Sequence, residues 1–143
     1  MNQMKRYDLA QQQFERSLQM VESSTLSQAI KDNAKLQHHF NLTVLAIGKK
    51  NLAEAKSHAE QYRAGADASK NPGQIKLAHE LAGRIALAEK DYDTTITELE
   101  QANDQDPRNL YRLSQAYQAK GDNAKAQDYL KKQAPGRERQ PLA

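Results

Sequence analysis

Hydrophobic and polar positions follow a helical period along almost the whole chain. Apolar side chains recur every three or four residues, and the first stretch shows this with Met4, Tyr7, Phe14, Leu18 and Val21. No stretch of useful length alternates with the period of two that a half-buried strand requires. The pattern therefore predicts an all-α protein.

Start and stop signals divide the chain into about seven helices. Thr25, with Gln28 three residues later, is typical of a helix start, and Gly48 is expected to end that helix. Asn71 and Asp106 each precede a proline, which is the pattern of a cap followed by the first helical residue. The predicted helices begin near residues 2, 25, 51, 71, 91, 106 and 122, and the last one ends near residue 133.

Connections between these helices are short, so consecutive helices are expected to form antiparallel hairpins. A shared spacing appears when the hairpin turns are superposed. It comprises Leu110, Leu113, Ser114, Tyr117, Ala126 and Leu130 in the last unit, His79, Ala82, Gly83, Ala86, Thr95 and Leu99 in the middle unit, and His39, Leu42, Thr43, Ala46, Ala55 and Ala59 in the first. Ala10, Phe14 and Ser17 match the second half of such a unit.

This spacing resembles the tetratricopeptide repeat, in which W-x2-L-G-x2-Y is followed by a small residue, an aromatic residue and a proline. The resemblance covers roughly residues 6–133 and implies a right-handed α-solenoid of stacked helix hairpins. It divides a repeat domain, residues 1–134, into a half-repeat at 1–22 and units at about 25–70, 73–106 and 107–133. Residues 135–143 are expected to form a flexible tail.

Two features depart from the family pattern. The spacings from Ala10 to Ala55 to Thr95 to Ala126 are 45, 40 and 31 residues, whereas the family repeats about every 34. The superhelix is therefore expected to be irregular. The chain also begins on an unpaired helix and ends without an additional closing helix. Either it is a piece of a longer protein, or self-association buries its ends.

In the family, the first helix of each hairpin lines a concave surface that binds peptides or partner helices. Carried over by position, this surface contains Phe40, Val44 and Ile47, then Glu80, Arg84 and Leu87, then Arg108, Tyr111, Gln115 and Gln118. A partner segment is expected to bury its apolar side chains against Phe40, Val44, Ile47 and Tyr111, with Glu80 and Arg84 orienting it. The alternative is that the long first helix covers the apolar residues of this set.

Some family members clamp a C-terminal carboxylate with basic and asparagine side chains. Arg108 and Arg112 match the basic pair of the last unit, but the other clamp positions hold Phe40, Val44 and Leu81, which cannot bind a carboxylate. A carboxylate clamp is therefore not expected.

Composition and charge exclude several classes of protein. The net charge of +3 arises from 21 basic and 18 acidic residues that are interspersed, which argues against a nucleic-acid-binding patch. The absence of cysteine excludes disulfides and thiolate metal sites. No apolar run approaches the roughly 18 residues of a transmembrane helix, and no signal-peptide core follows Met1. A soluble chain without membrane insertion is predicted.

Catalytic and metal-binding motifs are not found. No H-E-x-x-H, phosphate-binding glycine loop or G-x-S-x-G is present. His39 and His79 share a repeat position at which the family prefers a large aromatic residue, which favours a role in core packing. His38 and His39 are adjacent and lie on different faces of a helix, which is poor for chelation. No enzyme, cofactor or metal is therefore expected.

The sequence thus predicts a non-catalytic scaffold that binds another protein or a peptide in its groove. The alternative is a self-assembling module in which the first helix, with its apolar stripe, docks on the last helix of a second copy. The compartment stays open between the cytoplasm and export, because a chain that begins within a repeat could lack an upstream signal.

Overall fold

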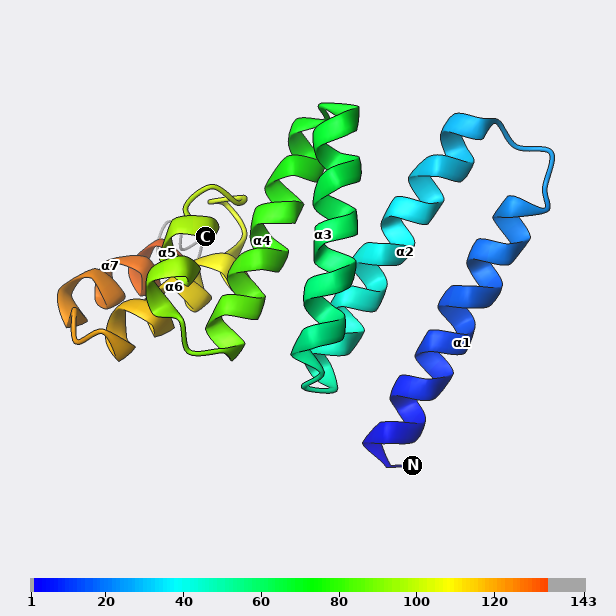
Figure 1. The fold of residues 1–143 in the computed structure, drawn as a ribbon. Helices are drawn as coiled ribbons and strands as arrows, with labels where there is room; N and C mark the ends of the chain where they lie inside the picture. Colours follow the sequence, from blue (N-terminus) through cyan, green and yellow to red (C-terminus); the bar gives the residue numbers. More distant parts are fainter. Residues whose placement is uncertain (1, 134–143) are drawn as a thin grey trace, which may run out of the picture.

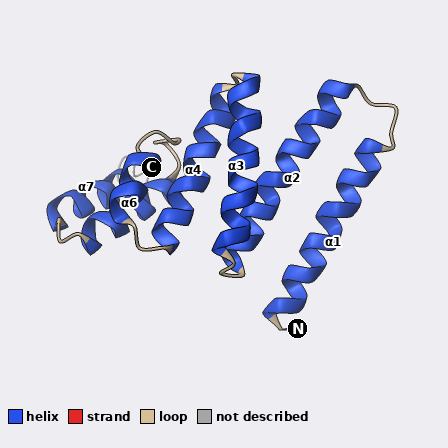
Figure 2. Cartoon of the chain, viewed as in Figure 1, coloured by secondary structure: helices blue, strands red, loops and turns tan. Residues whose placement is uncertain are grey.

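The computed structural model describes residues 2–133, and within this range it contains seven α-helices and no strand (Figures 1 and 2). The all-α prediction is confirmed. The helices are α1 (Gln3–Glu22), α2 (Gln28–Gly48), α3 (Leu52–Ser69), α4 (Pro72–Ala88), α5 (Tyr92–Leu99), α6 (Pro107–Ala119) and α7 (Asn123–Gln133). The predicted tail, residues 135–143, lies outside the described residues.

Side-chain caps set the helix starts. The predicted starts of α3, α4, α5 and α6 are confirmed. At each start a side chain accepts a hydrogen bond from a backbone N–H in the first turn of the helix: Asn51, Asn71, Asp91 and Asp106. The predicted start at Thr25 is wrong. Ser27 caps α2, with its hydroxyl accepting from the N–H of Ile30 at 3.3 Å. Thr25 instead belongs to the turn after α1, where the Ser24 hydroxyl accepts from the N–H of Leu26.

The turns after α2, α4 and α6 share one geometry. Lys50, Lys90 and Gly121 occupy the left-handed region, with φ of 61°, 63° and 89°. The next residue in each turn donates its N–H to a carbonyl five residues back, at 2.9 Å in all three cases: Asn51 to Ala46, Asp91 to Ala86 and Asp122 to Tyr117. This is the bond of a Schellman motif. The predicted end of α2 at Gly48 is confirmed, since Gly48 is its last helical residue and the chain reverses two residues later at Lys50.

Helix contacts form a linear arrangement. Each helix contacts the next one in the sequence, and in addition α2 contacts α4 and α4 contacts α6. Within residues 2–133, no such contact joins the odd-numbered helices to one another. Helices α2, α4 and α6 therefore form a continuous row, here called the central row. Figure 1 shows the helices following one another in chain order from α1 to α7, an arrangement consistent with a helical repeat.

Small residues at hairpin interfaces let the helices approach one another. A Cβ atom added to Gly83 of α4 would lie 2.5 Å from Cδ2 of Leu99 in α5. Ala55 is completely buried between α2 and α3, and Ala126 of α7 is 3% exposed. The core consists of three clusters, centred on Ala46, Ala55 and Ile85, on Tyr62, Ala66, Ala78 and Leu81, and on Leu99, Ala102, Leu113, Tyr117 and Ala126.

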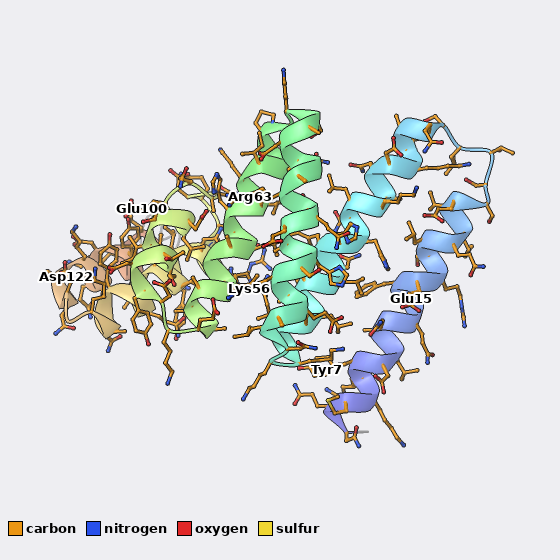
Figure 3. The ribbon with its side chains drawn as sticks, viewed as in Figure 1. Tyr7, Glu15, Lys56, Arg63, Glu100 and Asp122 are labelled. Atoms are coloured by element: carbon orange, nitrogen blue, oxygen red, sulfur yellow. The ribbon has the colours of Figure 1, made fainter. Side chains whose placement is uncertain are left out.

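Helix α1 is attached less firmly than the others. It contains no buried residue and contacts only α2. Its Tyr7 hydroxyl donates to the carbonyl of Gly48 at 2.9 Å and so links α1 to the end of α2 (Figure 3). No helix in residues 2–133 combines the length and apolar character needed to cross a membrane.

Candidate functional site

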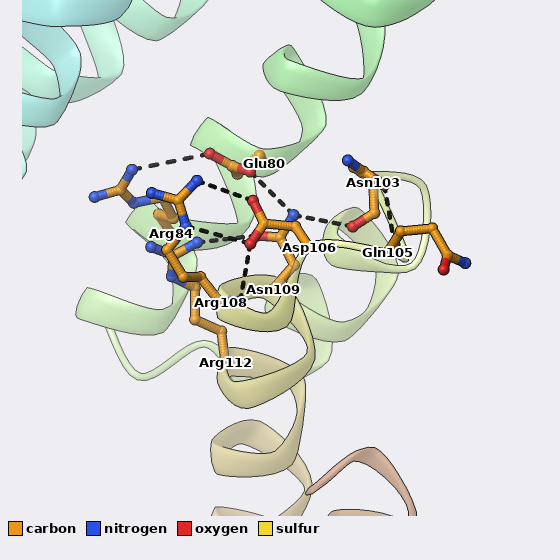
Figure 4. A network of polar contacts seen from close by, with 8 residues as sticks. All are labelled: Glu80, Arg84, Asn103, Gln105, Asp106, Arg108, Asn109 and Arg112. Atoms are coloured by element: carbon orange, nitrogen blue, oxygen red, sulfur yellow. Dashed lines mark hydrogen bonds and ion pairs between the residues drawn. The ribbon is translucent and has the colours of Figure 1, made fainter. Parts of the chain in front are cut away.

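The best-defined polar site lies where α6 begins against α4 (Figure 4). Asp106 caps α6 by accepting from the N–H of Arg108 at 2.9 Å. The Arg108 side chain folds back and donates from Nε at 3.2 Å and from Nη2 at 3.0 Å to the same carboxylate. These side-chain hydrogen bonds hold the pKa of Asp106 below its ordinary value. The cap therefore stays ionised at neutral pH.

Asn109 is the centre of the network, with only 1% of its surface exposed. Its Nδ2 donates to Oε1 of Glu80 at 3.0 Å and to the backbone oxygen of Asn103 at 3.2 Å. Its Oδ1 accepts from Nη1 of Arg112 at 2.9 Å. One buried amide thus connects α4, the loop after α5 and the exposed side of α6. Buried polar groups are stable only when bonded in this way.

Positive charge exceeds negative charge in this network. Two carboxylates, Glu80 and Asp106, face three guanidinium groups, Arg84, Arg108 and Arg112. Arg84 has no hydrogen bond to residues 2–133, and its ion pair with Glu80 is long, at 3.9 Å. Burial lowers the pKa of Arg84, and burial together with the charge of Arg84 lowers that of Arg112. An anion at this place would relieve the repulsion between the arginines.

Tyr111 lies on the exposed face of α6, which also carries Arg108 and Arg112. Its spacing from Arg108, Arg112 and Gln115 places all four on one side of the helix. Tyr111 is 44% exposed, an unusual value for an aromatic residue of this chain. Tyrosine and arginine are enriched among the few residues that carry most of the binding energy at protein interfaces.

Apart from Tyr111, the predicted site residues fall into three groups. Phe40, Val44 and Ile47 of α2 are half-buried against the cores of their own and the next hairpin, and the Phe40 ring meets Tyr62 edge-on at 5.5 Å. Their apolar face is therefore partly covered by the protein itself. Helix α4 separates them from Tyr111, because α2 makes no contact with α6.

The structure brings the remaining predicted residues together in pairs. Glu80 and Arg84 join the α6 network described above. Leu87 and Gln115 line an open hollow of about 460 Å³ that also includes Tyr92 and Gln118. The hollow continues the exposed face of Tyr111 toward the end of α6, since Gln115 lies one turn beyond Tyr111.

Sequence reasoning missed the role of Asn109, and no signal in the sequence marked it. The residue follows the predicted Asp-Pro helix start, where an exposed polar residue is ordinary. Arg112 was noted only as a family clamp position.

A second polar cluster joins α3, α4 and α5 on another side of the molecule. Glu98 accepts from Nη2 of Arg63 at 3.1 Å and contacts Nδ1 of His79 at 2.6 Å. With the ion pair of Lys56 and Glu89 at 2.6 Å, this cluster borders an open groove of about 320 Å³ that is rich in alanine. Figure 3 labels Lys56 and Arg63 of the groove. Both basic side chains that line this groove, Lys56 and Arg63, are already paired with carboxylates, so it offers an acidic partner less than the α4–α6 site does.

Comparisons of the chain with models of protein families, with curated proteins and with solved structures found no match. Evidence for function therefore comes from the geometry of the site.

Proposed function

We propose that the chain is a non-catalytic protein–protein interaction scaffold of the tetratricopeptide type, and that a partner segment lies along the central row across α4 and α6. One observation carries this proposal: Tyr111 is exposed on the face of α6 that also carries Arg108 and Arg112. These two arginines belong to a network in which three guanidinium groups face only two carboxylates. An aromatic anchor with adjacent guanidinium groups suits recognition of a peptide.

The charge of the site defines the partner segment. Glu80 is 5% exposed and already accepts from Asn109, so it does not meet a partner. Arg84 and Arg112 have N–H groups to spare, and guanidinium groups bind carboxylates in bidentate fashion. We therefore expect an acidic segment with one apolar side chain seated against Tyr111. The hollow at Leu87 and Gln115 would take its next residues.

The test is a native-lysate capture with the full chain beside two double variants. Tyr111→Ala with Arg84→Gln removes the anchor and the arginine without a hydrogen bond. Arg16→Gln with Met20→Ala removes a matched pair from the exposed face of α1, where Met20 is 67% exposed. Circular dichroism must show that both variants are folded.

A protein retained by the wild type and the α1 variant, and lost by the Tyr111 variant, supports the proposal. Its purified binding segment should then contain acidic residues and bind less tightly as salt increases. Equal recovery by all three baits contradicts the proposal.

The second candidate function is self-assembly through α1. The observation in its favour is that α1 exposes Leu9 and Met20, at 45% and 67%, about three turns apart on one face. Sedimentation of Leu9→Glu with Met20→Glu beside the wild type tests this function. An assembly that dissociates in the variant supports self-assembly, and a wild-type chain that is already monomeric at high concentration excludes it.

A further inference from the structure

Two histidines from different helices face each other in the first hairpin. Nδ1 of His39 in α2 lies 3.2 Å from Nδ1 of His58 in α3, with the ring centroids 5.4 Å apart and the rings tilted by 32°. Both rings are half-buried, so the packing of the hairpin holds them in place. The adjacent pair His38 and His39, the only close pair visible in the sequence, has a centroid separation of 6.4 Å.

The surroundings of His58 favour one tautomer. Its Nε2 faces the carboxylate of Glu54 at 3.8 Å. A carboxylate at this side favours a proton on Nε2 and leaves the lone pair of Nδ1 free to bind a proton donor or a metal ion. In the structure as it stands, Nδ1–H of His39 is then the donor in the contact between the two rings.

We propose that His39 and His58 together bind a divalent transition-metal ion through their Nδ1 atoms. Imidazole nitrogens bind zinc at about 2.0–2.1 Å, so two that share one tetrahedral ion are about 3.3 Å apart. The observed separation of 3.2 Å is already close to this distance. Binding moves the Nδ1 proton of His39 to its Nε2 through solvent. Imidazole ligands suit Zn²⁺, Ni²⁺ and Cu²⁺ rather than Mg²⁺ or Ca²⁺.

His39 borders a hollow that is open to solvent. The hollow, of about 420 Å³, lies between α2, α3 and the start of α4 and is also lined by Leu36, Gly65 and Gln74. Water in this hollow can complete the coordination of the ion. No group of three or more His, Asp or Glu side chains in residues 2–133 is placed to hold a metal. The site therefore has two protein ligands, and its affinity must be lower than that of a four-ligand structural site.

The experiment uses the full chain without an affinity tag, because a tag with histidines would bind the same ions. Equilibrium dialysis against ZnCl₂, NiCl₂ or CuCl₂ should give one bound ion per chain. Addition of the ion should also raise the melting temperature, since a ligand that binds only the folded state stabilises it. Both effects should disappear in His39→Gln and in His58→Gln, whereas Glu54→Gln should weaken binding by about tenfold.

His79→Gln is the matched control, because His79 contacts Glu98 rather than another histidine, and it should keep the metal effect. If His39→Gln does not fold, His58→Gln alone tests the proposal. The His58 side chain is 20% exposed, so its replacement should leave the fold intact. Nitrogen chemical shifts of the imidazoles provide a direct readout on the wild type, in which Nδ1 of both rings should shift on addition of ZnCl₂. An ion that binds equally to both single variants, or imidazole shifts confined to His38 or His79, would overturn the proposal.

Discussion

Glu80 of α4 accepts a hydrogen bond of 3.0 Å from the side-chain amide of Asn109 in α6, and both residues are buried. The bond connects successive hairpins across the central row, next to the arginines of the candidate site. Its geometry determines where Arg112 lies, because the same amide accepts from Arg112.

Replacing Asn109 with alanine should destabilise the fold by about 2–3 kcal/mol, because the carboxylate of Glu80 would remain buried without its donor. Urea unfolding followed by circular dichroism measures this change. Gln105→Ala, an exposed change in the loop before α6, should alter the free energy of unfolding by less than about 0.5 kcal/mol. A similar loss of unfolding free energy in both variants would show that the region before α6 is sensitive to any change. The hydrogen bond between Asn109 and Glu80 would then not be the cause.

Introducing glycine at Lys90 and removing it at the equivalent Gly121 should change the stability of the protein in opposite directions. Lys90 adopts φ of 63°, which costs a residue with a side chain about 1 kcal/mol or more. Lys90→Gly should therefore stabilise the protein by about 0.5 kcal/mol after the entropy of glycine in the unfolded chain is counted. Lys90→Ala removes the same side chain and should not stabilise it. Thermal unfolding of the three proteins distinguishes a backbone effect from a charge effect.

Gly121→Ala tests the same backbone effect by removing a glycine from the left-handed position of the turn. A Cβ atom at Gly121 would meet nothing within 4 Å, and the residue has φ of 89°. Any loss of stability, expected at about 1 kcal/mol, must therefore come from the backbone conformation. An unchanged melting temperature would mean that the turn relaxes without cost.

Helical glycines at two interfaces should respond differently to alanine. At Gly83, an added Cβ would lie 2.5 Å and 2.6 Å from two atoms of Leu99, which is completely buried. Overpacking costs about 1–3 kcal/mol and exceeds the gain of up to about 1 kcal/mol in helix propensity. At Gly65 the obstacle is Cδ1 of Leu36, a half-buried side chain that can turn away. We expect Gly83→Ala to destabilise and Gly65→Ala to be nearly neutral in urea unfolding.

A smaller side chain at position 99, which makes room for the added Cβ at position 83, provides the control for this prediction. Leu99→Val in the Gly83→Ala background should recover part of the loss, so the two changes should not be additive. Additive effects would place the cause of the loss elsewhere.

Asp106 gives a pH dependence with a defined sign. Hydrogen bonds from Arg108 lower its pKa below the ordinary value of 3.8. The ionised side chain therefore stabilises the fold above that pH, and this contribution is lost as the pH falls through the lowered value. Asp106→Asn keeps a capping side chain, as Asn71 shows at α4, but removes the charge. The free-energy difference between wild type and this variant should shrink as the pH falls below 3.8 and through the lowered pKa of Asp106.

At neutral pH, Asp106→Asn should cost less than about 1 kcal/mol, because Arg108 is largely exposed and solvent weakens its ion pair. Asp106→Ala, which removes the cap as well, should cost about 1 kcal/mol more. Equal losses for the two variants would show that charge, rather than capping, fixes the start of α6.

The parts of the fold that depend on neighbours in the sequence were predictable. Asn71-Pro72 and Asp106-Pro107 define helix starts because the cap and its target N–H groups are two or three residues apart. The site depends on contacts over longer separations. Asn109 and Glu80 are 29 residues apart, and His39 and His58 are 19 apart. Periodicity places each residue on a helix face, but the partner across the interface depends on how the hairpins stack.

Phe40 is a further case in which the sequence indicates a helix face but not the residues that cover it. Its spacing indicated a second apolar face on α2, yet the contact with Tyr62 that half-buries it comes from the neighbouring helix. The number of apolar residues on a face does not reveal whether protein or partner covers them.

The loose attachment of α1 has a kinetic consequence. Since α1 contacts only α2 and contains no buried residue, it can separate without disturbing the hairpins beyond. Native-state amide hydrogen exchange should therefore be fastest in α1 and slowest in α4, which contacts helices on both sides. Local unfolding would therefore begin at α1. The face of α2 that α1 covers would become transiently accessible, while the α4–α6 site remained folded.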